Sequence, residues 1–108
     1  MQPLTMTILT VFRSRLRPGV ESAYREVAVE MSRLVRLTEG FIDEKFYESP
    51  DGERVTIARF TDLASEHAWA SDPEHLAVQR RGRDEFYSWY DIAVAEELYS
   101  KTYAGESS

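Results

Sequence analysis

The sequence predicts an α+β domain with the βαββαβ order of ferredoxin-like folds, in which an antiparallel sheet carries helices on one face. Three observations support this prediction: a β-branched segment over 5–16, a helical stripe of apolar residues that starts at Val20, and a Pro-Asp-Gly turn between two short strand patterns. With 108 residues, the chain is expected to form a single domain over 1–100, followed by a flexible tail over 101–108.

The first strand carries apolar side chains on both faces. Ile8, Phe12 and Leu16 lie on one face, and Leu9 and Val11 lie on the other. This pattern is typical of a central strand in a sheet that is covered on both sides. Because the predicted helices are too few to cover both faces, we expect a partner sheet, most simply from a second copy of the chain.

A helix and a β-hairpin follow. The apolar residues of the helix recur at steps of three and four, at Val20, Tyr24, Val27, Met31, Leu34 and Val35. Gly40 is placed to end this helix. The hairpin pairs 41–48 with 54–61 through Pro50-Asp51-Gly52, where proline presets φ and glycine accepts a positive φ.

Two short helices and an ambiguous segment complete the chain. Asp62 and Asp72 are candidate N-caps for helices over 63–70 and 74–82, and Pro73 suits the start of the second helix. The last segment, 86–99, favours a helix by propensity, although Tyr90 and Ile92 alternate with polar or small residues as in a strand.

Composition and charge exclude several classes of function. Thirteen basic and nineteen acidic residues give a net charge of −6, which argues against nucleic-acid and anionic-membrane binding. The chain has no cysteine, so disulfides, thiolate nucleophiles and Cys-held metal clusters are excluded. No apolar run approaches the ~20 residues that span a bilayer. Since no signal sequence precedes the first strand, we expect a cytoplasmic protein.

Aromatic and basic residues concentrate between Trp69 and Tyr90. A pocket built from Trp69, His75 and the nearby arginines and tyrosines would suit a planar ligand with anionic or enolate-like character. The alternative is that Trp69 and the tyrosines are core residues and that the arginines complement the end of a helix. His75 has the intrinsic pKa of a general base, or it is a structural hydrogen-bonding residue.

A metal site receives no support from the spacing of possible ligands. His67 and His75 are the only histidines, and Pro73 lies between them. Glu66 and Glu74 are expected to be ordinary surface carboxylates. We therefore expect no metal site of the two-histidine, one-carboxylate type.

Most of the chain, from about Ile8 to Tyr99, resembles the antibiotic biosynthesis monooxygenase family, and the most specific matches lie in the second half. The matching residues are Trp69, Pro73-Glu74-His75, Gln79, Gly82-Arg83, Tyr87 and Tyr90, with weaker matches at Arg17-Pro18-Gly19 and Glu39-Gly40-Phe41. The resemblance implies a ferredoxin-like homodimer that forms a dimeric α+β barrel, and it assigns 86–99 to the last strand. It also implies a cofactor-independent monooxygenase that oxidises a small aromatic, polyketide or quinol-type substrate with O2, without metal, flavin or haem.

The resemblance also implies roles for individual residues. His75 or Tyr87 would take the proton from the substrate, and Arg83 would stabilise the resulting anion. The ring of the substrate would contact three further residues, Trp69, Phe12 and Tyr90.

Three other functions are known or conceivable for this superfamily and fold, and the sequence disfavours one of them. Haem degradation is disfavoured, because that branch uses an asparagine on the first strand and this chain contains no asparagine. One alternative is a non-catalytic dimeric domain that binds a small molecule in the same pocket. The other is a structural or regulatory dimer whose interior is filled by its own side chains.

Overall fold

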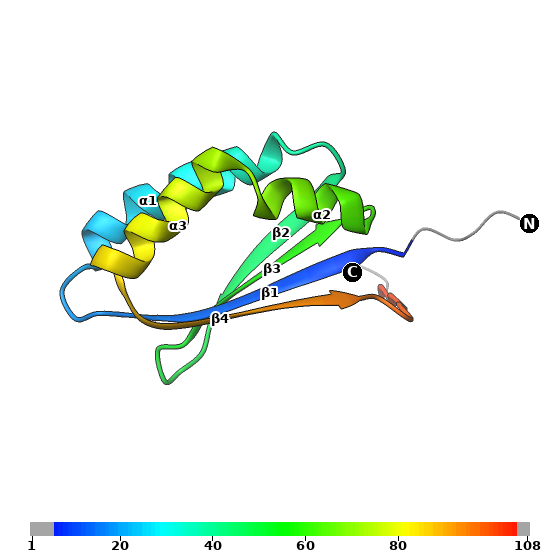
Figure 1. The fold of residues 1–108 in the computed structure, drawn as a ribbon. Helices are drawn as coiled ribbons and strands as arrows, with labels where there is room; N and C mark the ends of the chain where they lie inside the picture. The colour runs from blue at the N-terminus through cyan, green and yellow to red at the C-terminus, as the bar shows by residue number, and fades with distance from the viewer. Residues whose placement is uncertain (1–5, 106–108) are drawn as a thin grey trace, which may run out of the picture.

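The structure is a computed structural model that describes residues 6–105. Its elements in chain order are β1 (Ile8–Leu16), α1 (Glu21–Arg36), β2 (Phe41–Glu48), β3 (Arg54–Phe60), α2 (Leu63–Ala70), α3 (Pro73–Glu85) and β4 (Tyr87–Glu96). The helices lie together on one face of a single sheet (Figure 1). This arrangement confirms the predicted ferredoxin-like α+β fold, with α2 and α3 together in the place of the second helix.

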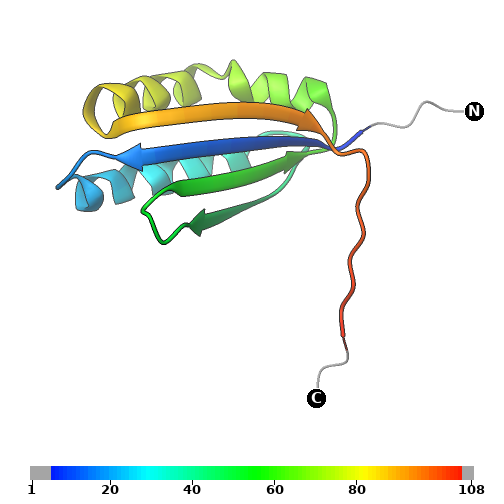
Figure 2. The same cartoon turned by 90° about the horizontal axis from the view of Figure 1, so that it is seen from below.

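The sheet has the order β2-β3-β1-β4, and every neighbouring pair of strands is antiparallel. β1 lies between β3 and β4, so that Phe12 is opposite both Thr56 and Ile92. The position of β1 between β3 and β4 confirms that it is a central strand, and the helices cover one of its two apolar faces (Figure 1). β4 runs beside β1 along its whole length (Figure 2). Most of the segment 86–99, for which propensity favours a helix, is therefore a strand, because pairing with β1 overrides the local preference; Phe86 and residues 97–99 lie outside this strand.

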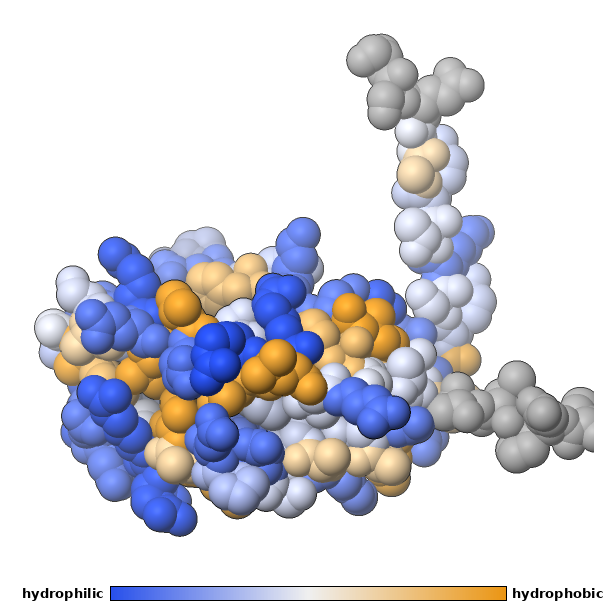
Figure 3. All heavy atoms as spheres, turned by 90° about the horizontal axis from the view of Figure 1, so that it is seen from above, coloured by the Kyte–Doolittle hydropathy of each residue, from blue (hydrophilic) through white to orange (hydrophobic). Residues whose placement is uncertain are grey.

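The core lies between the helices and the sheet. Its buried cluster consists of Leu34, Val35, Ala58, Phe60 and Trp69. The apolar stripe of α1 faces this core as predicted, and the outer surface of the helical layer is mostly hydrophilic with scattered hydrophobic residues (Figure 3). Beyond β4, residues 97–105 form no helix or strand. Thr5, the predicted start of the first strand, and residues 106–108 of the predicted tail lie outside the described residues.

Two helix ends differ from the prediction, and glycine has a different role in each case. α1 ends at Arg36, before Gly40, which has φ +88° and lies so close to Ser65 and Thr61 that no side chain would fit. α3 continues through Gly82 to Glu85. A Cβ on Gly82 would lie 2.6 Å from the ring of Tyr87, so this glycine permits close packing and does not end the helix.

The C-terminal end of α3 is held by a side chain from the other end of the sequence. Arg17, in the connection between β1 and α1, donates hydrogen bonds to the backbone carbonyls of Asp84 and Tyr87 at 3.1 Å and of Arg83 at 3.2 Å. The guanidinium group therefore satisfies carbonyls at the end of α3 that lack a helical partner.

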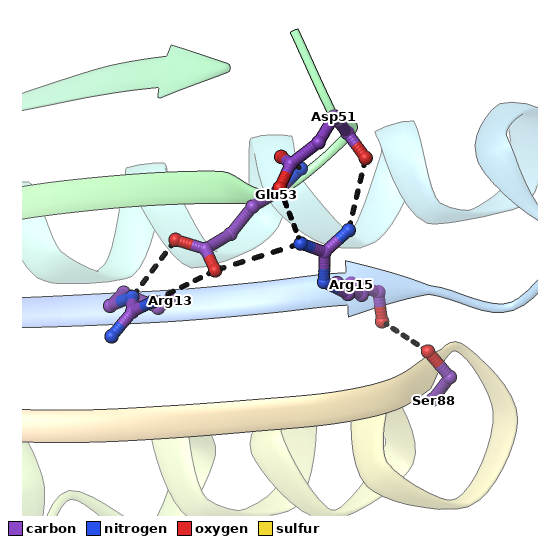
Figure 4. Close-up of polar contacts among 5 residues, drawn as sticks. All are labelled: Arg13, Arg15, Asp51, Glu53 and Ser88. Atoms are coloured by element: carbon purple, nitrogen blue, oxygen red, sulfur yellow. Dashed lines mark hydrogen bonds and ion pairs between the residues drawn. The ribbon is translucent and has the colours of Figure 1, made fainter. Parts of the chain in front are cut away.

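The face of the sheet opposite the helices carries a group of ion pairs near the β2–β3 turn (Figure 4). Arg13 makes two hydrogen bonds of 2.9 Å to the carboxylate of Glu53, and Arg15 lies 2.8 Å from that of Asp51. The backbone N–H of Glu53 and the Arg15 guanidinium lower the pKa of Asp51 to about 2. These bonds link the β2–β3 turn to β1, beside the backbone pairing of β1 with β3.

Candidate functional site

A cavity of about 300 Å³ lies between the helical layer and the sheet. Its floor comes from β1 and β3 through Phe12 and Thr56, one wall comes from α1 through Tyr24, and its inner end comes from α2 and α3. A cavity of about 150 Å³ accommodates one benzene molecule. The space is therefore large enough for a fused aromatic ring system of modest size.

Trp69 and His75 form a stacked pair at the inner end of the cavity. Their ring centroids are 3.8 Å apart and the ring planes differ by 5°. Two consecutive helices bring the rings together, because α2 ends one residue after Trp69 and α3 begins two residues before His75. Asp72 fixes the start of α3 by accepting a hydrogen bond of 3.0 Å from the backbone N–H of His75.

One hydrogen bond defines the tautomer of His75. Nδ1 lies 2.8 Å from the carbonyl oxygen of Trp69, which can only accept, so Nδ1 carries the proton in this bond. In the neutral ring, Nε2 then has a free lone pair. Burial lowers the pKa of His75 below its usual value, although the Trp69 carbonyl and Asp72 oppose this shift. His75 is thus a neutral base in a defined orientation beside an indole ring.

Tyr87 lines the same cavity from the start of β4. Its hydroxyl lies 2.8 Å from that of Tyr24, and one of the two hydroxyls donates to the other. The hydroxyl that accepts this hydrogen bond keeps its own proton, which it can donate to a ligand. Burial, together with the neighbouring Tyr24, raises the pKa of Tyr87 well above its usual value, which favours the protonated form. The pair is therefore suited to donating a hydrogen bond rather than to removing a proton.

The remaining predicted site residues differ in their positions. Phe12 lies in the cavity floor, with its ring 5.5 Å from that of Tyr87 and 5.8 Å from that of Tyr90. Tyr90 supports these rings but does not line the cavity. Arg83 lies outside it: its side chain is exposed and pairs with Asp84 at 3.7 Å. The structure therefore brings Trp69, His75, Tyr87 and Phe12 together and leaves Arg83 apart.

Two carboxylates in the cavity are not among the site residues that the sequence predicts. Glu66 is 4% exposed, so the expectation that it is a surface carboxylate is wrong. Glu44 on β2 accepts a hydrogen bond from Ser32 and pairs with Arg36 at 3.5 Å. Lysine and arginine do not occur among the described residues that line this cavity. In place of the predicted cationic surroundings, the cavity is lined by neutral polar groups and these two carboxylates.

Cations occur instead in an adjoining hollow that shares Phe12, Tyr24 and Glu44 with the cavity. This hollow includes Arg36 and Arg54. The Arg54 guanidinium lies 4.5 Å from the centre of the Phe46 ring and 3.2 Å from the carboxylate of Glu48. Stacking and ion pairing therefore hold both arginines in this adjoining hollow.

Within residues 6–105, no group of three or more His, Asp or Glu side chains is arranged to hold a metal ion. Over the same residues, none of the helices is both long and apolar enough to cross a membrane.

Comparison with known proteins places the chain in a family. In structure, it is similar to Rv0793 from Mycobacterium tuberculosis, with a TM-score of 0.78, 22% identity, and coverage of 89% of this chain and 99% of the other. A mutant of SnoaB, a cofactor-independent oxygenase from Streptomyces nogalater, gives a TM-score of 0.78 at 15% identity over 89% and 97% of the two chains.

In sequence, the chain is 26% identical over 86 residues to the uncharacterised protein YqjZ of Bacillus subtilis. The matched residues make up 80% of this chain and 75% of YqjZ. The model of the antibiotic biosynthesis monooxygenase (ABM) family matches residues 7–81, which is more than half of the chain. The chain therefore belongs to the antibiotic biosynthesis monooxygenase family.

Proposed function

We propose that this protein is a cofactor-independent monooxygenase that oxidises a small hydroxylated aromatic or quinol-type substrate with O2. The observation that carries the proposal is the Trp69–His75 pair, which presents a neutral base with a fixed tautomer to a cavity of aromatic dimensions. Membership of the family and the fold shared with the oxygenase SnoaB support the same reaction class.

The base in this reaction is Nε2 of His75, since the pKa shift of Tyr87 disfavours its deprotonated form. In an anthrone-type substrate, which has an activated ring CH2 group, His75 removes a proton from that group, and the carbanion passes one electron to O2. The substrate radical and superoxide combine to a peroxide, which takes back the proton from His75. Loss of water then leaves a ketone, so that CH2 and O2 become C=O and H2O and the substrate supplies all the electrons.

The hydroxyl pair of Tyr24 and Tyr87 stabilises the developing anion. A substrate oxygen that gains negative charge accepts a hydrogen bond from whichever hydroxyl does not donate to the other. This role replaces the one that the resemblance implies for Arg83, whose side chain lies outside the cavity. The indole of Trp69, which is stacked on His75, forms the aromatic surface against which the substrate ring packs.

We also propose that two copies pair through the open faces of their sheets. Phe12 and Thr56 line the cavity, so the alternating residues on the same strands point to the opposite face. At the centre of that face, Val11 lies opposite both Ile57 and Ala93. An apolar surface of this kind, bordered by the ion pairs of Figure 4, is suited to packing against its own copy.

Oxygen consumption tests the enzymatic proposal. Metal-stripped protein is mixed with a panel of anthrones and hydroquinones, and oxygen uptake and ketone or quinone formation are followed together. We expect uptake above background that falls by about 10²–10⁴-fold in His75→Phe, since general-base catalysis contributes that much. His75→Phe keeps an aromatic ring next to Trp69 and separates loss of the base from loss of stacking. Wild-type protein that binds these compounds without consuming oxygen would favour the alternative of a non-catalytic binding domain.

A further inference from the structure

Glu66 is a buried acidic residue on the inward face of α2. It is 4% exposed, and it lies one helical turn before Trp69 on the same side of the helix. Both residues line the cavity. A glutamate in such a short helix would ordinarily face solvent, as its neighbour His67 does.

The carboxylate of Glu66 has no hydrogen-bond donor in the part of the chain that the structure describes. The Nε2 atom of the exposed His67 imidazole lies 3.8 Å from a carboxylate oxygen of Glu66, beyond hydrogen-bond distance. Glu44, the other carboxylate of the cavity, differs in this respect because Ser32 and Arg36 both contact it. Since no buried side-chain oxygen of the described residues lacks a hydrogen-bond partner, the Glu66 oxygens open onto the cavity, where a ligand with a donor can reach them.

The acceptors at this end of the cavity define the kind of ligand that fits. Glu66 offers carboxylate oxygens, and His75 offers the lone pair of Nε2. No lysine or arginine among the described lining residues balances the charge of Glu66. A ring with a free hydroxyl can donate to these acceptors, whereas a ring with a carboxylate brings a second negative charge.

We propose that Glu66 is a specificity-determining residue that accepts a hydrogen bond from a ring hydroxyl of the ligand and rejects carboxylated rings. The inference rests on the proposed function in one respect, namely that the cavity binds an aromatic ring. The hydrogen bond holds the hydroxylated ring against Trp69 with its reactive position toward His75. Glu66 thereby sets which neutral rings are accepted, while His75 performs the chemistry.

Equilibrium binding under nitrogen tests this role without any turnover. The probes are 1,5-dihydroxynaphthalene, its dimethyl ether and 1-hydroxy-2-naphthoate, each titrated by quenching of tryptophan fluorescence. The variants are Glu66→Leu, which removes the acceptor, and Glu66→Gln, which removes the charge. Glu74→Gln, an exposed glutamate in the first turn of α3, is the matched control.

We expect Glu66→Leu to weaken binding of the diol about 10- to 100-fold, as for a hydrogen bond to a charged group, and to leave the dimethyl ether unchanged. In Glu66→Gln the hydroxynaphthoate should bind more tightly than in the wild type, because the repelling charge is gone. Glu74→Gln should match the wild type for all three probes.

Three results would each overturn the inference. In Glu66→Leu, these are an equal change in the affinity for the diol and for the ether, or unchanged binding of the diol. In the wild type, it is the absence of binding of any probe. Oxygen uptake is measured separately, so the two proposals can fail independently. A wild-type protein that prefers the diol through Glu66 but consumes no oxygen would refute the monooxygenase proposal and leave the role of Glu66 intact.

Discussion

The contact between Gly82 and Tyr87 makes a strong prediction about the cavity. Gly82 lies inside α3, where replacing glycine by alanine would ordinarily stabilise a helix by about 1 kcal/mol. Here the added Cβ would lie 2.6 Å from Cε2 of Tyr87, while ordinary contact begins at 3.4 Å. The ring must therefore retreat by about 0.8 Å from its buried position.

The retreat has two costs that exceed the gain in helix propensity. Overpacking of this kind costs about 1–3 kcal/mol. The Tyr24–Tyr87 hydrogen bond of 2.8 Å lengthens or breaks, which costs about 0.5–1.5 kcal/mol more. We therefore expect Gly82→Ala to lower the free energy of unfolding by about 1–3 kcal/mol and to disturb the hydroxyl pair in the cavity.

Urea unfolding at fixed protein concentration measures this effect. Tyr87→Phe isolates the loss of the hydrogen bond, and Tyr87→Leu removes the part of the ring that the new methyl group would meet. In the Tyr87→Leu background, Gly82→Ala should become neutral or stabilising, since only the helix propensity remains. A single variant Gly82→Ala that is as stable as the wild type would refute the assignment of Gly82 to close packing.

Three further predictions concern other parts of the molecule. Because burial lowers the pKa of His75 below 6.5, the unfolded chain binds more protons near and below that pH. The free energy of unfolding should therefore fall as the pH drops from 7 toward 5, and it should fall less steeply in His75→Phe. Urea unfolding at several pH values measures both proteins, and an equal dependence on pH in the two would contradict this expectation. Asp72→Ala should lower the free energy of unfolding by about 0.5–2 kcal/mol through loss of the N-cap, and Asp72→Asn should lower it much less. Thermal unfolding measures both variants, and equal losses of stability would contradict the role of Asp72 as an N-cap. If the open sheet faces pair, Val11→Arg should give a monomeric mass by light scattering, and a persisting dimer would exclude that face.

The fold could be predicted where the signals are local. The Pro50-Asp51-Gly52 turn is set by the conformations of those residues alone, and β2 spans the predicted residues. The end of α3 could not be predicted in the same way. Gly82 has the chemistry of a helix stop, but its role is set by Tyr87, which packs against it from the next strand. β4 likewise depends on β1, a partner that no local propensity reveals.

The aromatic residues of the site could be predicted from the sequence, but the positions of its charged side chains could not. Trp69, His75 and Tyr87 are conspicuous residue types, and their grouping in the chain carries over to the cavity. The direction in which a charged side chain points depends on helix rotation. Arg83 follows Gly82, which faces the cavity wall, and a step of about 100° turns it outward. Glu66 shares a helix face with the buried Trp69, and the spacing of three residues between them is the one signal that indicates its burial.

The bonds of Arg17 have a consequence for the order in which the protein folds. The last turn of α3 depends on a guanidinium from a residue 66 to 70 positions earlier in the chain. Such a non-local contact forms only after the two ends of the chain have met, so this turn should be completed late in folding. Amide hydrogens there should then exchange at the rate of global unfolding, and exchange by simple fraying of the helix would show that Arg17 does not hold it.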